Sequence, residues 1–285
     1  MTYFLAIILL SIITITGWGI ADFLLSKFPR YRNTVATIVI KFLIALTVLL
    51  FIKPLLVAPV VKNDNKTMIV GVSPDFPPFT YVDNDTTVGF DIDLIMEIGR
   101  RLNREVVLKS MPFSTLLPTL QLGHIQVIAS GLSATPERAQ HVLFTTPYLD
   151  NNPLVIVSLA TAPANSVADL ANKEVIVNEG YTADLYLSKI DGISLKRLKA
   201  PAEAFLALKS GRAIAFVTAQ DTVAPFFDQY GSEGFNVSVI PDTKENACFA
   251  IAPQYPELLK DIQKVLDVMQ QDGTLQATKT KWKMS

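Results

Sequence analysis

Residues 129–138, with the sequence ASGLSATPER, decide the fold of this chain. They follow an apolar run, residues 125–128, that predicts a buried strand, and they lead into a helix for which Thr135 suits the N-cap and Pro136 the first turn. A strand that ends in small polar residues before a helix leaves backbone N–H groups available to an anion, and Arg138 adds a guanidinium that can hold a carboxylate. An ordinary strand–helix turn with a solvent-facing arginine fits equally well at this point.

The composition of the 285-residue chain excludes several classes of function. A formal net charge of −1, with no basic excess, argues against a nucleic-acid partner. Cys248 is the only cysteine, so there is no intrachain disulfide and no multi-cysteine metal site. His124 and His141 are far apart in sequence, and we expect them at the surface rather than as ligands. No metal and no other cofactor is expected.

The N-terminal residues 1–60 predict a transmembrane helical hairpin, with helices over about residues 3–25 and 34–57. The mostly apolar run at residues 34–52 alone would be about 28 Å long as a helix, which is enough to cross a bilayer core. The loop at residues 26–33 has three basic residues, so the positive-inside rule places it in the cytoplasm. The chain beyond about residue 60 is therefore expected on the outer side of the inner (cytoplasmic) membrane, in the periplasm or outside the cell.

A cleaved signal peptide is the alternative to a retained hairpin. A signal peptide has one short apolar region, which two long runs do not fit, and cleavage after Ala58 would leave Pro59 directly after the cut. A lipoprotein anchor needs a cysteine at the start of the mature chain, and none precedes Cys248. We therefore expect the hairpin to be the tether.

After a polar linker at residues 61–67, predicted strands and helices alternate. Examples are strands at residues 68–72 and 213–218 and helices at residues 89–103 and 256–271. Such alternation predicts an α/β protein with mainly parallel sheets. Roughly 220 residues are long for one open sheet and suffice for two lobes.

Four motifs carry a resemblance to a known family. They are GVSPDFPPF at residues 71–79, GFDIDL at 89–94, SGLSATPER at 130–138 and FTTPY at 144–148. In this order and spacing they resemble the extracellular solute-binding proteins for polar amino acids, which serve bacterial ABC importers. The resemblance covers roughly residues 66–284. Each motif alone is weak, but four in register are specific.

The resemblance implies a two-lobe periplasmic-binding-protein (flytrap) fold with two mainly parallel sheets. Lobe 1 would comprise residues 66–150 plus 248–285, and lobe 2 residues 151–247. An amino acid would lie in the cleft, at the carboxyl ends of the strands.

The resemblance also implies roles for lobe 1 residues. Arg138 would grip the α-carboxylate of the ligand, helped by the backbone of Ser133. The Gly131 carbonyl and the Ser133 hydroxyl would accept hydrogen bonds from the α-ammonium. Phe76 and Phe90 would sandwich the stem of the ligand side chain.

Lobe 2 departs from the family pattern at two positions. Residues 178–182, NEGYT, stand where the family usually has a Gly-Ser/Thr-Thr turn; Thr182 can still start a helix that helps to hold the carboxylate, while Tyr181 adds bulk at the cleft. The aspartate that usually pairs with the ammonium falls on Asp221 if the strand has a two-residue insertion, and on Ala219 if it has none. Both assignments stay open, and with Ala219 the ligand need not be a standard α-amino acid.

The side-chain pocket is expected to draw on Ser73, Asp75, Glu179 and Tyr181. The two carboxylates favour a cationic ligand slightly. The leading hypothesis is a membrane-tethered solute-binding protein that delivers a polar amino acid to the permease of an ABC importer.

Two alternatives to that hypothesis use the same scaffold. One is a flytrap sensor that signals through the hairpin. The other is a periplasmic dehydratase-like enzyme, with Glu179 as a general acid. The chain shows no nucleophile–base pair, so no catalytic residue is expected.

Overall fold

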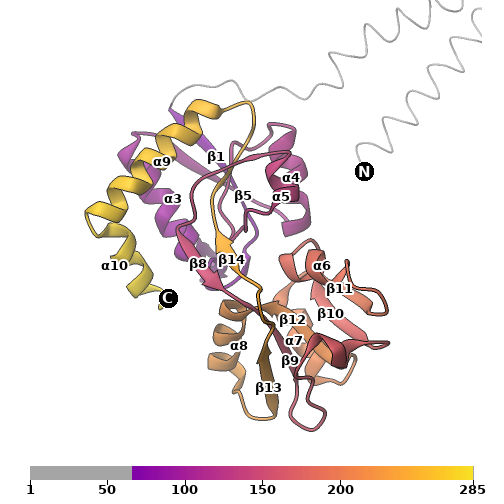
Figure 1. The fold of residues 1–285 in the computed structure, drawn as a ribbon. Coiled ribbons are helices and arrows are strands. Elements are labelled where there is room, and N and C mark those ends of the chain that lie inside the picture. Colours follow the sequence, from indigo (N-terminus) through magenta and orange to yellow (C-terminus); the bar gives the residue numbers. More distant parts are fainter. Residues whose placement is uncertain (1–65, 285) are drawn as a thin grey trace, which may run out of the picture. The chain divides into compact units, whose positions relative to one another are not determined.

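Two five-stranded sheets, each covered by helices, form the part of the chain that the structure describes, residues 66–284 (Figure 1). The structure is a computed structural model. This two-lobe α/β architecture confirms the predicted fold class, but each sheet is mixed rather than mainly parallel, because one strand in each runs antiparallel to both of its neighbours. The predicted transmembrane hairpin lies outside the described residues. Within residues 66–284, no helix is both long enough and apolar enough to cross a membrane.

The first sheet defines lobe 1 and has the strand order β5-β1-β6-β15-β7. Strands β5, β1 and β6 are parallel, whereas β15 is antiparallel to both β6 and β7. The bounds are β1 Thr67–Val72, β5 Glu105–Ser110, β6 Val127–Ile128, β7 Leu143–Phe144 and β15 Ala250–Ile251. The chain therefore returns to lobe 1 near its C-terminus to complete the sheet.

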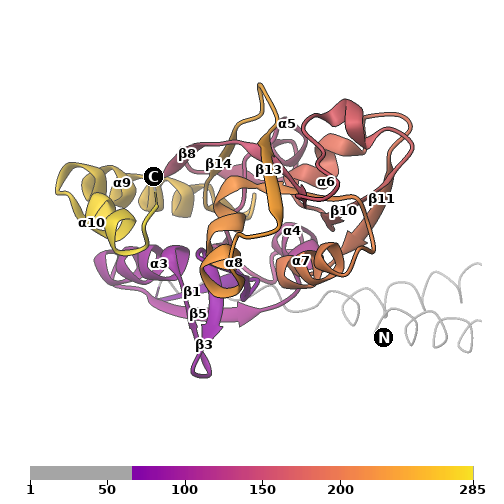
Figure 2. The same ribbon diagram turned by 90° about the horizontal axis from the view of Figure 1, so that it is seen from below.

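Five helices of the described part of the chain belong to lobe 1. They are α3 (Phe90–Arg101), α4 (Phe113–Gln121), the one-turn α5 (Pro136–Ala139), α9 (Pro256–Gln271) and α10 (Thr274–Lys281). Among them, α10 packs on the helices α3 and α9. In α3, Phe90, Leu94 and Ile98 form one buried stripe, which is the stripe expected from their spacing. Helices α3, α9 and α10 lie side by side in Figures 1 and 2, and the bounds of α9 match the predicted helix at residues 256–271.

A three-stranded antiparallel ribbon in lobe 1 was not predicted. It consists of β2 (Asp75–Phe76), β3 (Thr80–Asp83) and β4 (Thr86–Val88). Strands of two to four residues are too short to show a period of hydrophobicity, which explains why the sequence pattern misses them. The ribbon matters because it positions Asp75 and Phe76.

The second sheet defines lobe 2 and has the order β11-β10-β12-β9-β13. Its strands are β9 (Leu154–Leu159), β10 (Glu174–Asn178), β11 (Ser194–Leu198), β12 (Ala215–Ala219) and β13 (Phe235–Val239), and its helices are α6 (Thr182–Leu187), α7 (Pro201–Lys209) and α8 (Val223–Tyr230). All five residues of β12 are buried because both faces of the sheet are covered. Phe216 packs on Phe205 of α7, and its neighbour Val217 belongs to the core on the opposite face, with Leu187 of α6.

Two antiparallel strands join the lobes (Figure 1). Strand β8 (Leu149–Asn152) leads from lobe 1 into lobe 2, and β14 (Glu245–Ala247) leads back. Glu245 pairs with Asn152 and Ala247 with Leu149, and the register shifts between these pairs. Such an irregularity re-aims side chains, and here it brings Glu245 and Asn246 to the turn described next.

Candidate functional site

Arg138 lies at the centre of the site and joins the two lobes. Helix α5 begins at Pro136 with Thr135 as its N-cap, as predicted, and the Thr135 hydroxyl accepts a hydrogen bond from the Arg138 backbone N–H at 3.3 Å. The guanidinium turns back beneath this turn, where Nη1 donates to the Ser133 carbonyl at 2.7 Å and Nη2 donates to the Gly180 carbonyl of lobe 2 at 2.8 Å. Only 6% of Arg138 is exposed.

The buried guanidinium is suited to hold an anion. Burial lowers the pKa of Arg138 to about 10, and the nearby carboxylates of Glu245 and Glu137 oppose that shift, so the side chain remains a cation at neutral pH. Both of its hydrogen bonds go to neutral carbonyls. A carboxylate would be a stronger partner, because it carries the opposite charge and can accept two parallel N–H bonds from one guanidinium.

The turn above Arg138 is held from two sides. The buried carboxylate of Asp91 accepts from the Gly131 N–H at 2.7 Å, and Asn246 Oδ1 accepts from the Ala134 N–H at 2.9 Å. Burial raises the pKa of Asp91 to about 7, and its bond from Gly131 limits that rise. Gly131 has φ +58°, and a Cβ there would stand 2.6 Å from the Phe76 ring. Backbone angle and close packing therefore both require glycine.

Four aromatic rings gather beside this turn. Phe76 stacks on Phe79 with ring centroids 5.0 Å apart, and Arg138 Cζ lies 6.0 Å from the centre of the Phe113 ring. From lobe 2, Tyr181 contacts Phe113 at 4.2 Å and Phe76 at 5.2 Å between centroids. Phe113 thus joins the site although it was not among the expected residues. Its place directly after β5, at the carboxyl edge of the sheet, is the signal that could have indicated it.

Phe90 contacts only Phe79 among these four rings and lies deeper in lobe 1. It is fully buried in the lobe 1 core, where it packs on Tyr148 at 5.8 Å and on Phe79 at 6.4 Å between centroids. Its position at the start of α3 turns it towards the sheet rather than towards lobe 2. The structure therefore places Phe113, and not Phe90, opposite Phe76.

Three carboxyl groups, those of Glu245, Asp221 and Asp75, line the cavities at the cleft. Burial raises the pKa of Glu245 to about 7. A hydrogen bond with the Thr182 side chain and the charge of Arg138 limit this rise, whereas the charge of Asp221 adds to it. Burial also raises the pKa of Asp221 and of Asp75, although the Ser73 hydroxyl, which donates to Asp75 at 2.7 Å, limits the second shift. These pKa values are raised because the carboxylates have lost water without gaining enough positive charge.

The structure also places the two candidates for the ammonium partner. Ala219 is the last residue of β12, where it pairs with Leu154 and is buried in the sheet. Asp221 follows in a short turn, and its own backbone N–H donates to Asn152 Oδ1 at 3.1 Å. Asp221 lines one small cavity together with Glu245 and Gly131. Asp221, and not Ala219, therefore lies at the cleft.

The remaining predicted residues occupy different places. Ser133 is buried beneath the turn with its carbonyl bound to Arg138, and Ser73 is buried with its hydroxyl bound to Asp75. Glu179 is exposed at the end of β10 and lines none of the cavities described here. The predicted residues that the structure brings together are Phe76, Gly131, Arg138, Tyr181, Thr182 and Asp221.

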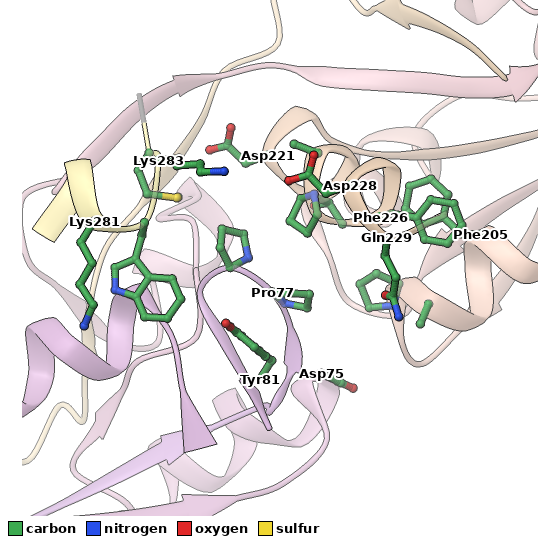
Figure 3. A pocket seen from close by; sticks show the side chains of 18 residues that line it. Asp75, Pro77, Tyr81, Phe205, Asp221, Phe226, Asp228, Gln229, Lys281 and Lys283 are labelled. Atoms are coloured by element: carbon green, nitrogen blue, oxygen red, sulfur yellow. The ribbon is translucent and has the colours of Figure 1, made fainter. Parts of the chain in front are cut away.

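Two cavities of very different volume lie at the cleft between the lobes. The cavity at Gly131 and Glu245 measures about 10 Å³. A groove of about 540 Å³ shares Asp221 with it and opens outward between Pro77, Tyr81 and Trp282 of lobe 1 and Phe226 of lobe 2 (Figure 3). Within residues 66–284, no group of three His, Cys, Asp or Glu side chains is placed to hold a metal ion.

Comparisons with known proteins agree with this geometry. Residues 68–285 match the family described as bacterial extracellular solute-binding proteins, family 3. The arginine-binding extracellular protein ArtP of Bacillus subtilis (strain 168) is 32% identical over 228 residues, which cover 78% of this chain and 88% of ArtP. ABC transporter arginine-binding protein 1 of Escherichia coli (strain K12) is 28% identical over 74% of this chain and 88% of its own.

Solved structures give the same result. An ancestral arginine-binding protein bound to arginine is 34% identical, with a TM-score of 0.71 over 76% of this chain and 97% of that one. The P235GK mutant of ArgBP from T. maritima is 37% identical, again with a TM-score of 0.71, over 76% and 94% of the two chains. These relatives are binding proteins and not enzymes. The chain therefore belongs to the bacterial extracellular solute-binding proteins, family 3.

Proposed function

We propose that the chain is the membrane-tethered receptor of an ABC importer and that it binds a polar amino acid with a cationic side chain, arginine being the first candidate. The importer follows from the family, and the tether rests on the apolar N-terminal sequence. The ligand class rests on the charges in the cleft and on the names of the relatives.

One observation supports the amino-acid ligand most directly. Arg138 is a buried cation of lobe 1 whose Nη2 faces the Gly180 turn of lobe 2, so a carboxylate bound at Nη2 would lie between the two lobes. Contacts that exist only when the lobes are together make ligand binding favour the closed form. A permease that recognises the closed form could then distinguish loaded from empty receptor.

The balance of charge supports a cationic side chain. Asp75, Asp221 and Glu245 contribute three acidic groups to the cleft, and of these Glu245 acts on the guanidinium of Arg138. An α-carboxylate on Arg138 would satisfy the cation, and the α-ammonium would satisfy one or two carboxylates near Gly131. A second cation on the ligand would compensate Asp75, which lies in the groove beyond (Figure 3).

A thermal-shift screen of the purified full-length chain against the twenty amino acids tests this proposal. Ligand at a hundredfold excess over Kd stabilises by about 2.7 kcal/mol, which corresponds to roughly 5–10 °C in Tm for a domain of this size. We expect arginine and lysine to give the largest shifts and glutamate to give none. A screen in which no amino acid raises Tm would contradict the proposal, and a largest shift with glutamate would contradict its charge argument.

A further inference from the structure

Tyr181 occupies a slot between two lobe 1 rings. Its ring lies 4.2 Å from that of Phe113, tilted by 44°, and 5.2 Å from that of Phe76 in an edge-on contact. Tyr181 is 8% exposed although it is the N-cap residue of the short helix α6, and its hydroxyl is buried with no hydrogen-bond partner among the described residues. A buried phenol without a partner is costly, so the packing of the ring must compensate.

The slot adjoins Arg138 directly. Phe113 lies 6.0 Å from the guanidinium carbon of Arg138, and the Phe76 ring lies against Gly131. A ligand whose carboxylate is held at Arg138 would therefore place its side chain beside these two rings. The neighbouring cavity of about 10 Å³, which Phe76 and Gly131 line, has room for about one water molecule.

The residue before Tyr181 occupies the other half of the site. The Gly180 carbonyl accepts from Arg138 Nη2, the atom that would otherwise bind the carboxylate of a ligand. Asp184 fixes this turn, because it accepts from the Gly180 N–H at 3.0 Å and forms an ion pair with Arg197 at 3.0 Å. One lobe 2 turn thus provides both an oxygen for the guanidinium and a ring for the aromatic slot.

We propose that residues 180–181 act as a built-in substitute for the ligand: the Gly180 carbonyl occupies the position on Arg138 that a carboxylate would take, and the Tyr181 ring occupies the side-chain slot between Phe76 and Phe113. The inference rests on the proposed amino-acid site. A ligand with a long side chain must displace the Tyr181 ring, whereas one without a side chain need displace only the carbonyl. Tyr181 therefore sets affinity and selectivity by competing with the ligand.

Tyr181→Ser tests this competition, because serine is a good N-cap and preserves the start of α6. We expect the full-length variant to bind arginine about tenfold more tightly than the wild type, the order expected from two aromatic contacts, with glycine affinity unchanged. Tyr181→Phe, which keeps the ring and removes the unpartnered hydroxyl, should bind arginine no more tightly than the wild type does. Lys189→Ala is the matched control, since it removes an ion pair to Glu137 that also joins the lobes, at 2.7 Å, but lies outside the slot.

A second measurement needs no ligand. Without the Tyr181 ring in the slot, the lobes of the ligand-free protein should separate more often. Amide hydrogen exchange at residues 131–134 and 180–185 should therefore be faster in Tyr181→Ser than in Tyr181→Phe. If Tyr181→Ser loses the fold, Tyr181→Leu should shift both measurements in the same direction by less.

The two measurements separate the inference from the proposed function. Unchanged exchange, or arginine bound equally or more weakly by Tyr181→Ser, would overturn the inference even if the wild type binds amino acids. If neither wild type nor variant binds any amino acid, the proposed function fails, and the inference that rests on it fails as well.

Discussion

Removal of the guanidinium of Arg138 should abolish binding without unfolding the protein. Arg138→Met keeps an unbranched apolar stem in a position that is 6% exposed, and it removes the donors Nη1 and Nη2. A bidentate carboxylate would make two charge-assisted hydrogen bonds with these donors, each worth about 1.5–3 kcal/mol. The sum of about 3–6 kcal/mol corresponds to a 10²–10⁴-fold weaker Kd, since about 1.4 kcal/mol is tenfold.

Stability should change less than binding in this variant. The Ser133 and Gly180 carbonyls each lose a partner, at a cost of about 1–3 kcal/mol if both stay buried, but the protein no longer has to bury a cation. Isothermal titration calorimetry with the amino acid that gives the largest thermal shift measures Kd, and the ligand-free melting temperature checks the fold. Arg212→Ala, which alters an exposed arginine in lobe 2, is the control. A folded Arg138→Met protein with Kd within about threefold of the wild type would refute the assignment of Arg138 to the carboxylate.

Three further predictions concern pH, packing and topology. The pKa of Glu245 in the folded protein, about 7, lies above its ordinary value of 4.5, so its stabilising contribution is present below pH 4.5 and is lost as pH rises through 7. The Tm of the ligand-free protein should therefore fall less between pH 4.5 and 7 in Glu245→Gln than in the wild type. Parallel curves of Tm against pH would contradict this prediction. In Gly131→Ala the new methyl group would meet two phenylalanine rings at a residue with φ +58°, so chemical denaturation should show a free energy of unfolding lower by about 2–4 kcal/mol. Gly211→Ala, at a residue with φ +70° in open space, should lose about 1 kcal/mol. Equal losses in the two variants would rule out the packing argument. Reporter fusions after residue 33 and after residue 66 should be active on opposite sides of the membrane, and the same side for both would refute the hairpin.

The predictions that rested on local pattern were the accurate ones. The strand, turn and helix at residues 125–138 depend on an apolar run, a proline and an N-cap within fourteen residues, and the structure has all three elements there. Helix α9 likewise follows from its own apolar spacing. The Gly131, Ser133 and Arg138 grouping is close in sequence, so its geometry is largely set by the turn itself.

The site residues that lie far in sequence from residues 129–138 could not be predicted from local pattern. Phe90 and Phe113 both stand at the start of a lobe 1 helix, and only the packing of each helix decides which ring faces the cleft. Glu245 lies in a connecting strand with no motif around it, and it reaches the site through a register shift against β8. Its raised pKa depends on Asp221, Arg138 and Thr182, which are distant in sequence.

The sequence by itself determined the α/β class and the local turn at residues 129–138 that carries Arg138, because hydrophobic period, caps and turn residues act over a few positions. Only the tertiary structure decided what faces that turn. The Gly180 carbonyl and the Tyr181 ring lie more than forty residues from Arg138, and they meet it only because two separately folded sheets come together across a cleft. Burial and electrostatic contact between the lobes depend on that approach, and no local pattern encodes it.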